Sequence, residues 1–252
     1  MHESNNSMMT DVISQDLGLL PLEVAHTSFL LERLGQDCQP LQYLRELTQN
    51  SLEAIGRSGQ SVDILWHAAP ISFASGNSGL KLSITDSGDG MIAGELESHI
   101  NRLSSSGSQQ THAGNFGVGA KISTALNNPT GVRYRSWKHG LGHEILLCRD
   151  TTGRYGLRQY ALGNDEFSYS PQVADSNKPA MIETHGTGVT LLGQNEESNT
   201  AMPAGVTSPA WISKYLNSRY SRFPQAATVR VDEASLAGSN DAGGTRTLTG
   251  QK

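Results

Sequence analysis

The feature that most constrains the fold is an apolar strand that ends at an aspartate followed by two glycines. The sequence LKLSITD, residues 80–86, alternates apolar and polar side chains and predicts a strand with one buried face. Gly88 and Gly90 follow directly and let the backbone turn sharply beside Asp86. A turn rich in aspartate and glycine is also a common way to end a strand. If the carboxylate is buried, it can accept a hydrogen bond from the exocyclic amine of adenine, and it would reject guanine.

A helix predicted over residues 40–56 carries acids and an amide on one face. Pro40 occupies a favoured first helical position, and Gly56 is typical of a helix end. At about 100° per residue, Glu46, Asn50 and Glu53 lie within about 60° of one another, opposite a mostly apolar side. An amide oxygen suits Mg²⁺ that is shared with phosphates, and a carboxylate one turn away can hold or deprotonate a water. A solvated polar face is the simpler alternative.

A second glycine cluster, AGNFGVGAK, contains Gly114, Gly117 and Gly119 and leads directly into a short helix. Glycine-rich loops at helix starts expose backbone N–H groups that can bind phosphates. This cluster is not the dinucleotide fingerprint, because no apolar strand leads into it, and it lacks the spacing and hydroxyl of a P-loop. Lys121 is a candidate counter-charge for a phosphate, and a solvated lysine is the alternative.

The chain after this cluster is predicted to be rich in strands. Antiparallel strand patterns separated by turn signals run over residues 132–160, and GTGVTLLG, residues 186–193, predicts a further strand. Residues 163–186 form a polar excursion between them. A helix is expected over residues 211–223 and a strand over residues 228–232.

Composition excludes several classes of protein. The formal net charge of −5 gives no global basic footprint for nucleic acid, although a local basic strip stays possible. Cys38 and Cys148 are too few for a disulfide scaffold and lack metal-ligand spacing. The N-terminus lacks the pattern of a signal peptide, and no run approaches the roughly 18 apolar residues of a membrane span. We therefore expect a soluble, cytoplasmic protein without membrane contact.

Four segments in order resemble the nucleotide-binding motifs of the gyrase, heat-shock chaperone, histidine kinase and MutL (GHKL) superfamily. They are RELTQNSLEAI, TDSGDGM, GNFGVGAK and HGTGVTLL. The resemblance covers residues 40–193. It implies an α/β fold, a two-layer sandwich of a mixed, mostly antiparallel sheet with helices on one face (the Bergerat-type ATP-binding fold). It also implies ATP and Mg²⁺ as cofactors, with ATP held between the helices and the sheet.

The resemblance also implies a role for individual residues. Glu46 is the general base, Asn50 is the magnesium ligand, and Asp86 binds adenine. Met91 lines the adenine pocket, and Thr187 supports the adenine beside the aspartate. The other residues implied to bind the nucleotide are Gly88, Gly90, Gly114, Asn115, Phe116, Gly117, Val118, Gly119 and Lys121.

Within the superfamily, residues 104–121 most resemble the ninety-kilodalton heat-shock chaperones and the microrchidia ATPases. Residues 103–113 would then form a mobile lid over the nucleotide. Histidine kinases usually lack an acid at the position of Glu46, which favours a slow ATP hydrolase over a kinase. Glu53 is a departure, because many members have aspartate there.

The expected organisation has four parts. A flexible tail spans residues 1–20, the ATP-binding domain spans residues 21–195, a connector or transducer element begins over residues 196–233, and a disordered tail spans residues 234–252. Lys214 in the connector is a candidate phosphate sensor, although a surface lysine is the commoner case. Two functions stay open: ATP-driven lid closure and self-association that acts on a protein client or nucleic acid, or a nucleotide-gated switch that does not hydrolyse ATP.

Overall fold

The structure is a computed structural model that describes residues 27–58, 60–101, 118–163, 165–238 and 244–251. The helices of these residues are α1 (Thr27–Gln36), α2 (Gln42–Ser58), α3 (Ala93–Asn101), α4 (Val118–Ala125), α5 (Trp211–Arg219) and α6 (Glu233–Ala237), with one 3-10 turn, η1 (Asp175–Asn177). The strands are β1 (Val62–Ser72), β2 (Ser78–Asp86), β3 (Val132–Lys138), β4 (Leu141–Arg149), β5 (Tyr155–Leu157), β6 (Tyr160–Gly163), β7 (Glu166–Ser168), β8 (Gln172–Val173), β9 (Gly186–Leu191), β10 (Ala227–Asp232) and β11 (Thr245–Thr247).

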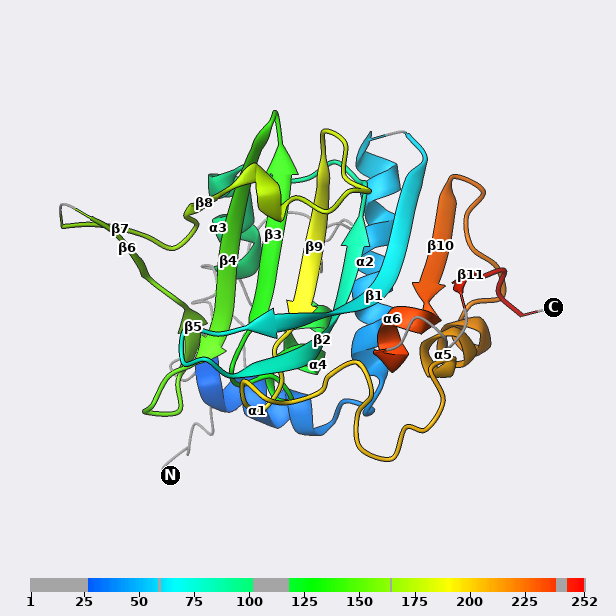
Figure 1. The fold of residues 1–252 in the computed structure, drawn as a ribbon, viewed down its shortest axis with the longest axis horizontal. Helices are drawn as coiled ribbons and strands as arrows, with labels where there is room; N and C mark the ends of the chain where they lie inside the picture. Colours follow the sequence, from blue (N-terminus) through cyan, green and yellow to red (C-terminus); the bar gives the residue numbers. More distant parts are fainter. Residues whose placement is uncertain (1–26, 59, 102–117, 164, 239–243, 252) are drawn as a thin grey trace, which may run out of the picture.

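The main sheet is mixed and mostly antiparallel. Its strand order is β11-β10-β1-β2-β9-β3-β4-β5, and β8 adds to β4 beside this path. The β1–β10 pair is parallel, whereas the other pairs of the sheet are antiparallel. Figure 1 shows β9 between β2 and β3, so the last strand motif of the sequence reaches the centre of the sheet. The two glycine-flanked motif strands, β2 and β9, are therefore direct neighbours.

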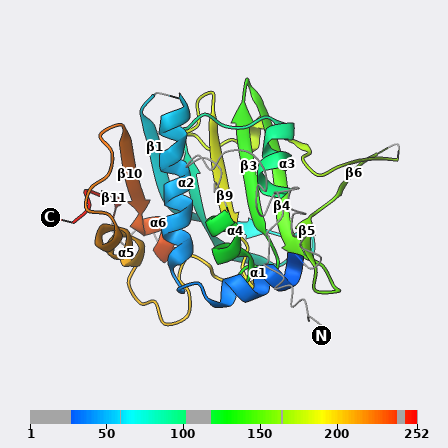
Figure 2. The same cartoon turned by 180° about the vertical axis from the view of Figure 1, so that it is seen from behind.

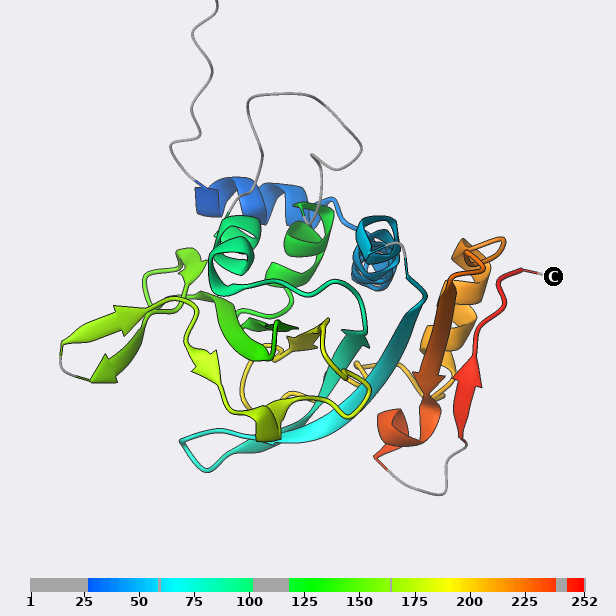
Figure 3. The same cartoon turned by 90° about the horizontal axis from the view of Figure 1, so that it is seen from above.

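The larger helices form a layer on one face of the sheet. Figure 2 shows α1, α2, α3 and α4 in front of the strands, and Figure 3 shows the same helices stacked above the sheet when it is seen along its edge. The helix α5 lies beside α2, and the short α6 packs against β1. The predicted two-layer α/β sandwich is confirmed.

The core lies between this helical layer and the sheet because alternate residues of the strands point toward the helices. Leu44 and Leu47 of α2 and Ile64 and Trp66 of β1 are almost fully buried there. The Trp66 indole also donates a 3.1 Å hydrogen bond to the Thr48 hydroxyl, which satisfies a polar group within the apolar layer. The predicted apolar back of α2 is therefore the side that packs on the sheet.

Two regions differ from the sequence-based expectation. The strand pattern over residues 155–162 divides into β5 and β6, and β6 pairs with β7 in a separate ribbon that extends from the body (Figure 1). Part of the segment expected to be a disordered tail is ordered: α6 and β11 form there, and β11 pairs with β10. Leu248 is buried beside them. The strand β10, within the expected connector, extends the main sheet. The expected N-terminal tail, residues 1–20, lies outside the described residues.

Candidate functional site

A pocket lies between the helical layer and the sheet, at the point where β2 and β9 meet α2. Helices α2, α3 and α4 form its walls, and β2, β3, β9 and the turn after β2 form its floor. Its lining residues are Leu47, Asn50, Ser51, Ala54, Asp86, Gly90, Met91, His99, Ile100, Ala120, Lys121, Tyr134, Thr187 and Val189. Three of the four motif segments thus meet in one cavity, and the described part of the fourth contributes Ala120 and Lys121.

Asp86 is held in this pocket by hydrogen bonds from two directions. The Ser51 hydroxyl of α2 donates to Asp86 Oδ2 at 2.9 Å, and the Gly88 amide donates to Asp86 Oδ1 at 3.0 Å. The residue is 7% exposed, and Thr187 lies directly opposite it in the β2–β9 pair. A carboxylate oxygen can accept more than one hydrogen bond. Asp86 is therefore oriented and can still accept a hydrogen bond from a ligand amine.

The turn after Asp86 leaves no room for side chains at its glycines. A Cβ at Gly88 would lie 2.5 Å from the Ala54 Cβ and 2.8 Å from Asp86 Oδ1. Gly90 has a φ of +62°, and a Cβ there would overlap the backbone carbonyl oxygen of Trp137. Only glycine tolerates both this conformation and this approach. The two glycines bring the backbone close to the pocket floor.

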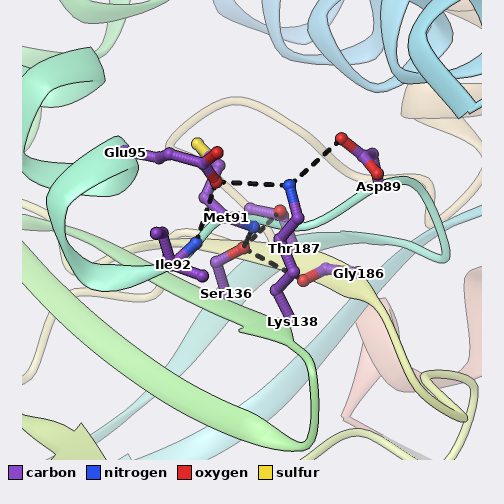
Figure 4. Close-up of polar contacts among 8 residues, drawn as sticks. All are labelled: Asp89, Met91, Ile92, Glu95, Ser136, Lys138, Gly186 and Thr187. Atoms are coloured by element: carbon purple, nitrogen blue, oxygen red, sulfur yellow. Dashed lines mark hydrogen bonds and ion pairs between the residues drawn. The ribbon is translucent and has the colours of Figure 1, made fainter.

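A hydroxyl network on β3 fixes the same turn from below (Figure 4). The Met91 amide donates to the Ser136 hydroxyl at 2.8 Å, and Ser136 Oγ lies 2.9 Å from Thr187 Oγ1 and 3.2 Å from the Gly186 carbonyl oxygen. Ser136 therefore links the turn after β2 to the start of β9 through one side chain. Ser136 is a buried polar residue of β3, between Tyr134 and the end of the strand, and none of the four sequence motifs contains it.

An ion pair closes the outer edge of the turn. The Lys138 ammonium lies 3.4 Å from Asp89 Oδ2 and 3.3 Å from Glu95 Oε2, and Figure 4 shows it between the two carboxylates. Glu95 also accepts a hydrogen bond from the Ile92 amide, and this bond lowers the Glu95 pKa. The start of α3 is thereby tied to β3 at the rim of the pocket.

The polar face of α2 is only partly directed into the pocket. Asn50 lines the cavity. Glu46 lies one turn earlier against Gly119 of α4, so closely that a Cβ at Gly119 would overlap Glu46 Oε2. Glu46 also forms a 3.0 Å ion pair with Arg45. Glu53 instead accepts a hydrogen bond from Gln49 at 3.2 Å and is not among the lining residues. Glu46 is not among the lining residues either, so Asn50 alone of the three expected polar groups lines the pocket.

Lys121 is buried at the side of the pocket. Its ammonium donates to the His99 carbonyl oxygen at 2.5 Å, and its side chain is 1% exposed. Burial lowers the Lys121 pKa to about 8. The alternative of a solvated lysine is therefore wrong. Lys121 lines the same cavity as Asp86 and Asn50.

Several predicted contact residues lie outside the described part of the chain. These are Gly114, Asn115, Phe116 and Gly117, together with the expected lid over residues 103–113. Val118 begins α4, and Gly119 follows it on the side of Glu46. Lys214 is exposed on α5 and does not line this pocket.

The described residues fit a magnesium ion only as a partner of phosphates. They contain no cluster of three or more acidic, histidine or cysteine side chains that could hold a metal ion alone. Mg²⁺ commonly takes one or two protein oxygens and completes its octahedron with phosphates and waters. The Asn50 amide, one turn from Glu46, is suited to that limited share of the ligands.

No model of a known protein family matches the chain, and no curated protein matches it. Among solved structures, the fold is similar to the B-subunit of the DNA gyrase from Myxococcus xanthus, with a TM-score of 0.50 and 12% sequence identity. The match covers 88% of this chain and 56% of the gyrase subunit, so the chain spans little more than half of that protein. At this identity the likeness concerns the fold alone.

The fold is thus similar to that of a gyrase B-subunit, whereas membership of the GHKL superfamily, which the four motifs predicted, stays a prediction. The finer resemblance to heat-shock chaperones and microrchidia ATPases stays a prediction. Within the described residues, no helix has the length and apolar character needed to cross a lipid bilayer.

Proposed function

We propose that the chain binds ATP with Mg²⁺ in the pocket beneath α2 and hydrolyses it slowly, as a GHKL-type ATPase domain. Closure of the lid, residues 103–113, would then drive a conformational change or the association of two copies. Protein clients or nucleic acid are the partners on which such a change would act. The gyrase-like fold supports this class, and the geometry around Asp86 supports the choice of nucleotide.

The observation that carries the proposal is the environment of the Asp86 carboxylate. It is buried at the end of β2, oriented by Ser51 and Gly88, and faces the same cavity as Met91 and Thr187. An ionised acceptor in a desolvated site favours a ligand that donates, and adenine presents an exocyclic amine where guanine presents a carbonyl. The pocket therefore selects adenine by the cost of leaving Asp86 opposed to an acceptor.

Chemistry on the phosphates would take place at the α2–α4 end of the pocket. Asn50 would hold Mg²⁺, which neutralises phosphate charge when bound. Glu46 would orient a water and accept its proton, because it lies one helical turn from Asn50 and against the start of α4. The backbone N–H groups at that helix start would bind phosphate oxygens.

A second candidate function is a nucleotide-gated switch without turnover. The ion pair between Glu46 and Arg45 favours it, since the arginine occupies a carboxylate oxygen that would otherwise hold the attacking water. In this case ATP binding alone would set the conformation, and Glu46 would serve only to position α4.

The two functions are distinguished by comparing Glu46→Ala with Glu53→Ala, a matched loss of charge on the same helix. Hydrolysis of ATP is measured by phosphate release and affinity by calorimetry. We expect Glu46→Ala to lower hydrolysis by about 10² or more while ATP affinity stays within a few fold. Glu53→Ala should behave as wild type. ATP binding without hydrolysis in wild type would support the switch, and absence of ATP binding would contradict both functions.

A further inference from the structure

The face of the sheet opposite the helices carries a second pocket, which is lined by both apolar and polar side chains. It lies across β1, β2, β9 and β3 and is bounded by Asn177 and Pro179, in and after η1. Figures 1 and 3 show η1 on the side of the sheet away from α1–α4. This pocket is therefore separated from the nucleotide pocket by the thickness of the sheet.

Strand register aligns the polar side chains of this pocket in two rows. The first row runs His67, Ser83, Thr190 and Arg133 across four neighbouring strands. The second row runs Thr85, Gly188 and Arg135 across three strands and continues to Glu144 of β4. Because neighbouring strands are about 4.8 Å apart, His67 and Arg133 are separated by roughly 14 Å. The pocket is thus the size of a small molecule.

Gly188 leaves an open floor in the middle of the second row. A Cβ built there would meet only the Thr85 hydroxyl, at 3.6 Å, so neither the fold nor the backbone geometry requires a glycine. The absent side chain instead creates space between Thr85 and Arg135. A ligand group in this space would lie beside the arginines.

The arginine end of the pocket has more donors than it uses. Arg135 Nε donates to Glu144 Oε2 at 2.6 Å, whereas Arg133 Nε lies 4.0 Å from the same oxygen. Arg133 Nε is buried and has no hydrogen-bond partner among the described residues. The guanidinium groups of Arg133 and Arg135 therefore share the Glu144 carboxylate, and the three side chains together keep a net positive charge. A buried donor without a partner destabilises the folded protein, and an acceptor ligand would relieve this cost.

The pocket floor between the arginines and His67 also carries hydrogen-bond donors, the hydroxyls of Ser83 and Thr190. Ser83 Oγ and Thr190 Oγ1 are 2.9 Å apart, and one of the two hydroxyls donates its proton to the other in a hydrogen bond. The other proton of the pair can be donated to a ligand, because each hydroxyl carries one proton and two acceptor sites. His67 Nε2 lies 3.0 Å from Thr85 Oγ1, and burial lowers the His67 pKa.

We propose that this pocket binds the phosphoryl group of a small molecule, with Arg133 and Arg135 as the charged ligands and the Ser83–Thr190 hydroxyls as further donors. Arginine forks match the geometry of phosphate oxygens and bind them through two parallel hydrogen bonds. The enclosing η1 segment limits the ligand to a small molecule. The site is distinct from the nucleotide pocket and does not depend on the function proposed for it.

Inorganic phosphate is the probe that tests the site. It is titrated into ¹⁵N-labelled protein at constant ionic strength, with sodium chloride as the compensating salt, and amide and arginine Nε signals are followed. We expect saturable shifts at Arg133 Nε and at the Gly188 and Thr190 amides. Shifts confined to Gly119–Lys121, or shifts that chloride reproduces, would overturn the proposal.

Two variants locate the binding on the protein. Arg133→Met keeps an apolar stem and should weaken phosphate binding by at least about tenfold, whereas Arg154→Met removes an exposed arginine and should leave binding within about twofold. Gly188→Ala adds one methyl group to the pocket floor where the fold accommodates it, and should weaken binding several-fold. Equal affinity for wild type and for both pocket variants, each shown to be folded by circular dichroism, would overturn the assignment.

Discussion

The hydroxyl of Ser51 donates a 2.9 Å hydrogen bond to the carboxylate of Asp86, and both residues are buried. This bond joins the middle of α2 to the last residue of β2, so the helix that carries Asn50 also orients the acid at the end of the strand. The Gly88 amide holds the other carboxylate oxygen. The rotamer of Asp86 is consequently fixed before any ligand arrives, which lowers the entropy cost of binding.

Removal of this orienting bond should weaken nucleotide binding. We expect Ser51→Ala to lower ATP affinity by about tenfold or more, because a hydrogen bond to a charged group is worth about 1.5 kcal/mol or more and Asp86 would lose a bond that orients it. Calorimetric titration measures the change. Ser218→Ala on α5, an exposed hydroxyl that bonds within its own helix, is the control. Unchanged affinity in Ser51→Ala would show that Asp86 needs no support from α2.

Two glycines that are four residues apart should respond in opposite ways to alanine. Gly90→Ala forces a Cβ into the Trp137 carbonyl oxygen at a positive φ, so we expect a loss of several kcal/mol in the free energy of unfolding. Gly94 lies in the first turn of α3, and a Cβ there meets no atom within 4 Å. Gly94→Ala should raise stability by about 0.5–1 kcal/mol. Urea denaturation compares the two, and equal effects would contradict this packing around the turn.

Burial of Lys121 should make stability depend on pH in the mildly alkaline range. Its pKa falls from 10.5 to about 8 in the folded protein, because burial disfavours the ammonium. Between these values the unfolded chain binds more protons than the folded chain, so the free energy of unfolding rises with pH. Below pH 8 the lysine is charged in both states, and the full cost of burying the charge is present.

We expect a rise of about 1–2 kcal/mol between pH 7.5 and 9.5 that Lys121→Met abolishes. Lys214→Met, on the surface of α5, should keep the rise. The range stops at pH 9.5 because burial raises the pKa of Tyr43 and Tyr134, and ionisation of these residues in the unfolded chain opposes the effect above pH 10. Denaturant titrations at several pH values measure the slope. An identical slope in wild type and Lys121→Met would refute the buried-lysine explanation.

The sequence predicted the layers of the fold and the position of the Asp86 pocket because both depend on local patterns. Alternation predicts β2 and β9 from their own residues, and the apolar side of α2 follows from helical spacing. The glycines at positions 88 and 90 indicate a close backbone approach without naming the neighbour. The structure identifies these neighbours as Ala54, which is close to Gly88, and Trp137, which is close to Gly90.

Other features depend on contacts between distant segments and were not predicted. β11 has three exposed residues, Thr-Arg-Thr, and forms because β10 offers a free edge. Ser51 lies on the mostly apolar side of α2, and helical spacing alone gives no indication that Asp86 lies opposite its hydroxyl. The second pocket, on the sheet face opposite the helices, results from the register of four strands, and no single strand contains all of its polar residues.

The central claim is that Asp86 selects adenine in this pocket, and nucleotide titration tests it most directly. Wild-type protein and Asp86→Asn are titrated with ATP and with GTP in the presence of Mg²⁺ by isothermal calorimetry. We predict that wild type binds ATP and binds GTP at least about tenfold more weakly, and that Asp86→Asn loses at least about tenfold in ATP affinity, or roughly 1.4 kcal/mol. Equal affinity of wild type for ATP and GTP, or an Asp86→Asn variant that binds ATP as wild type does, would contradict the account.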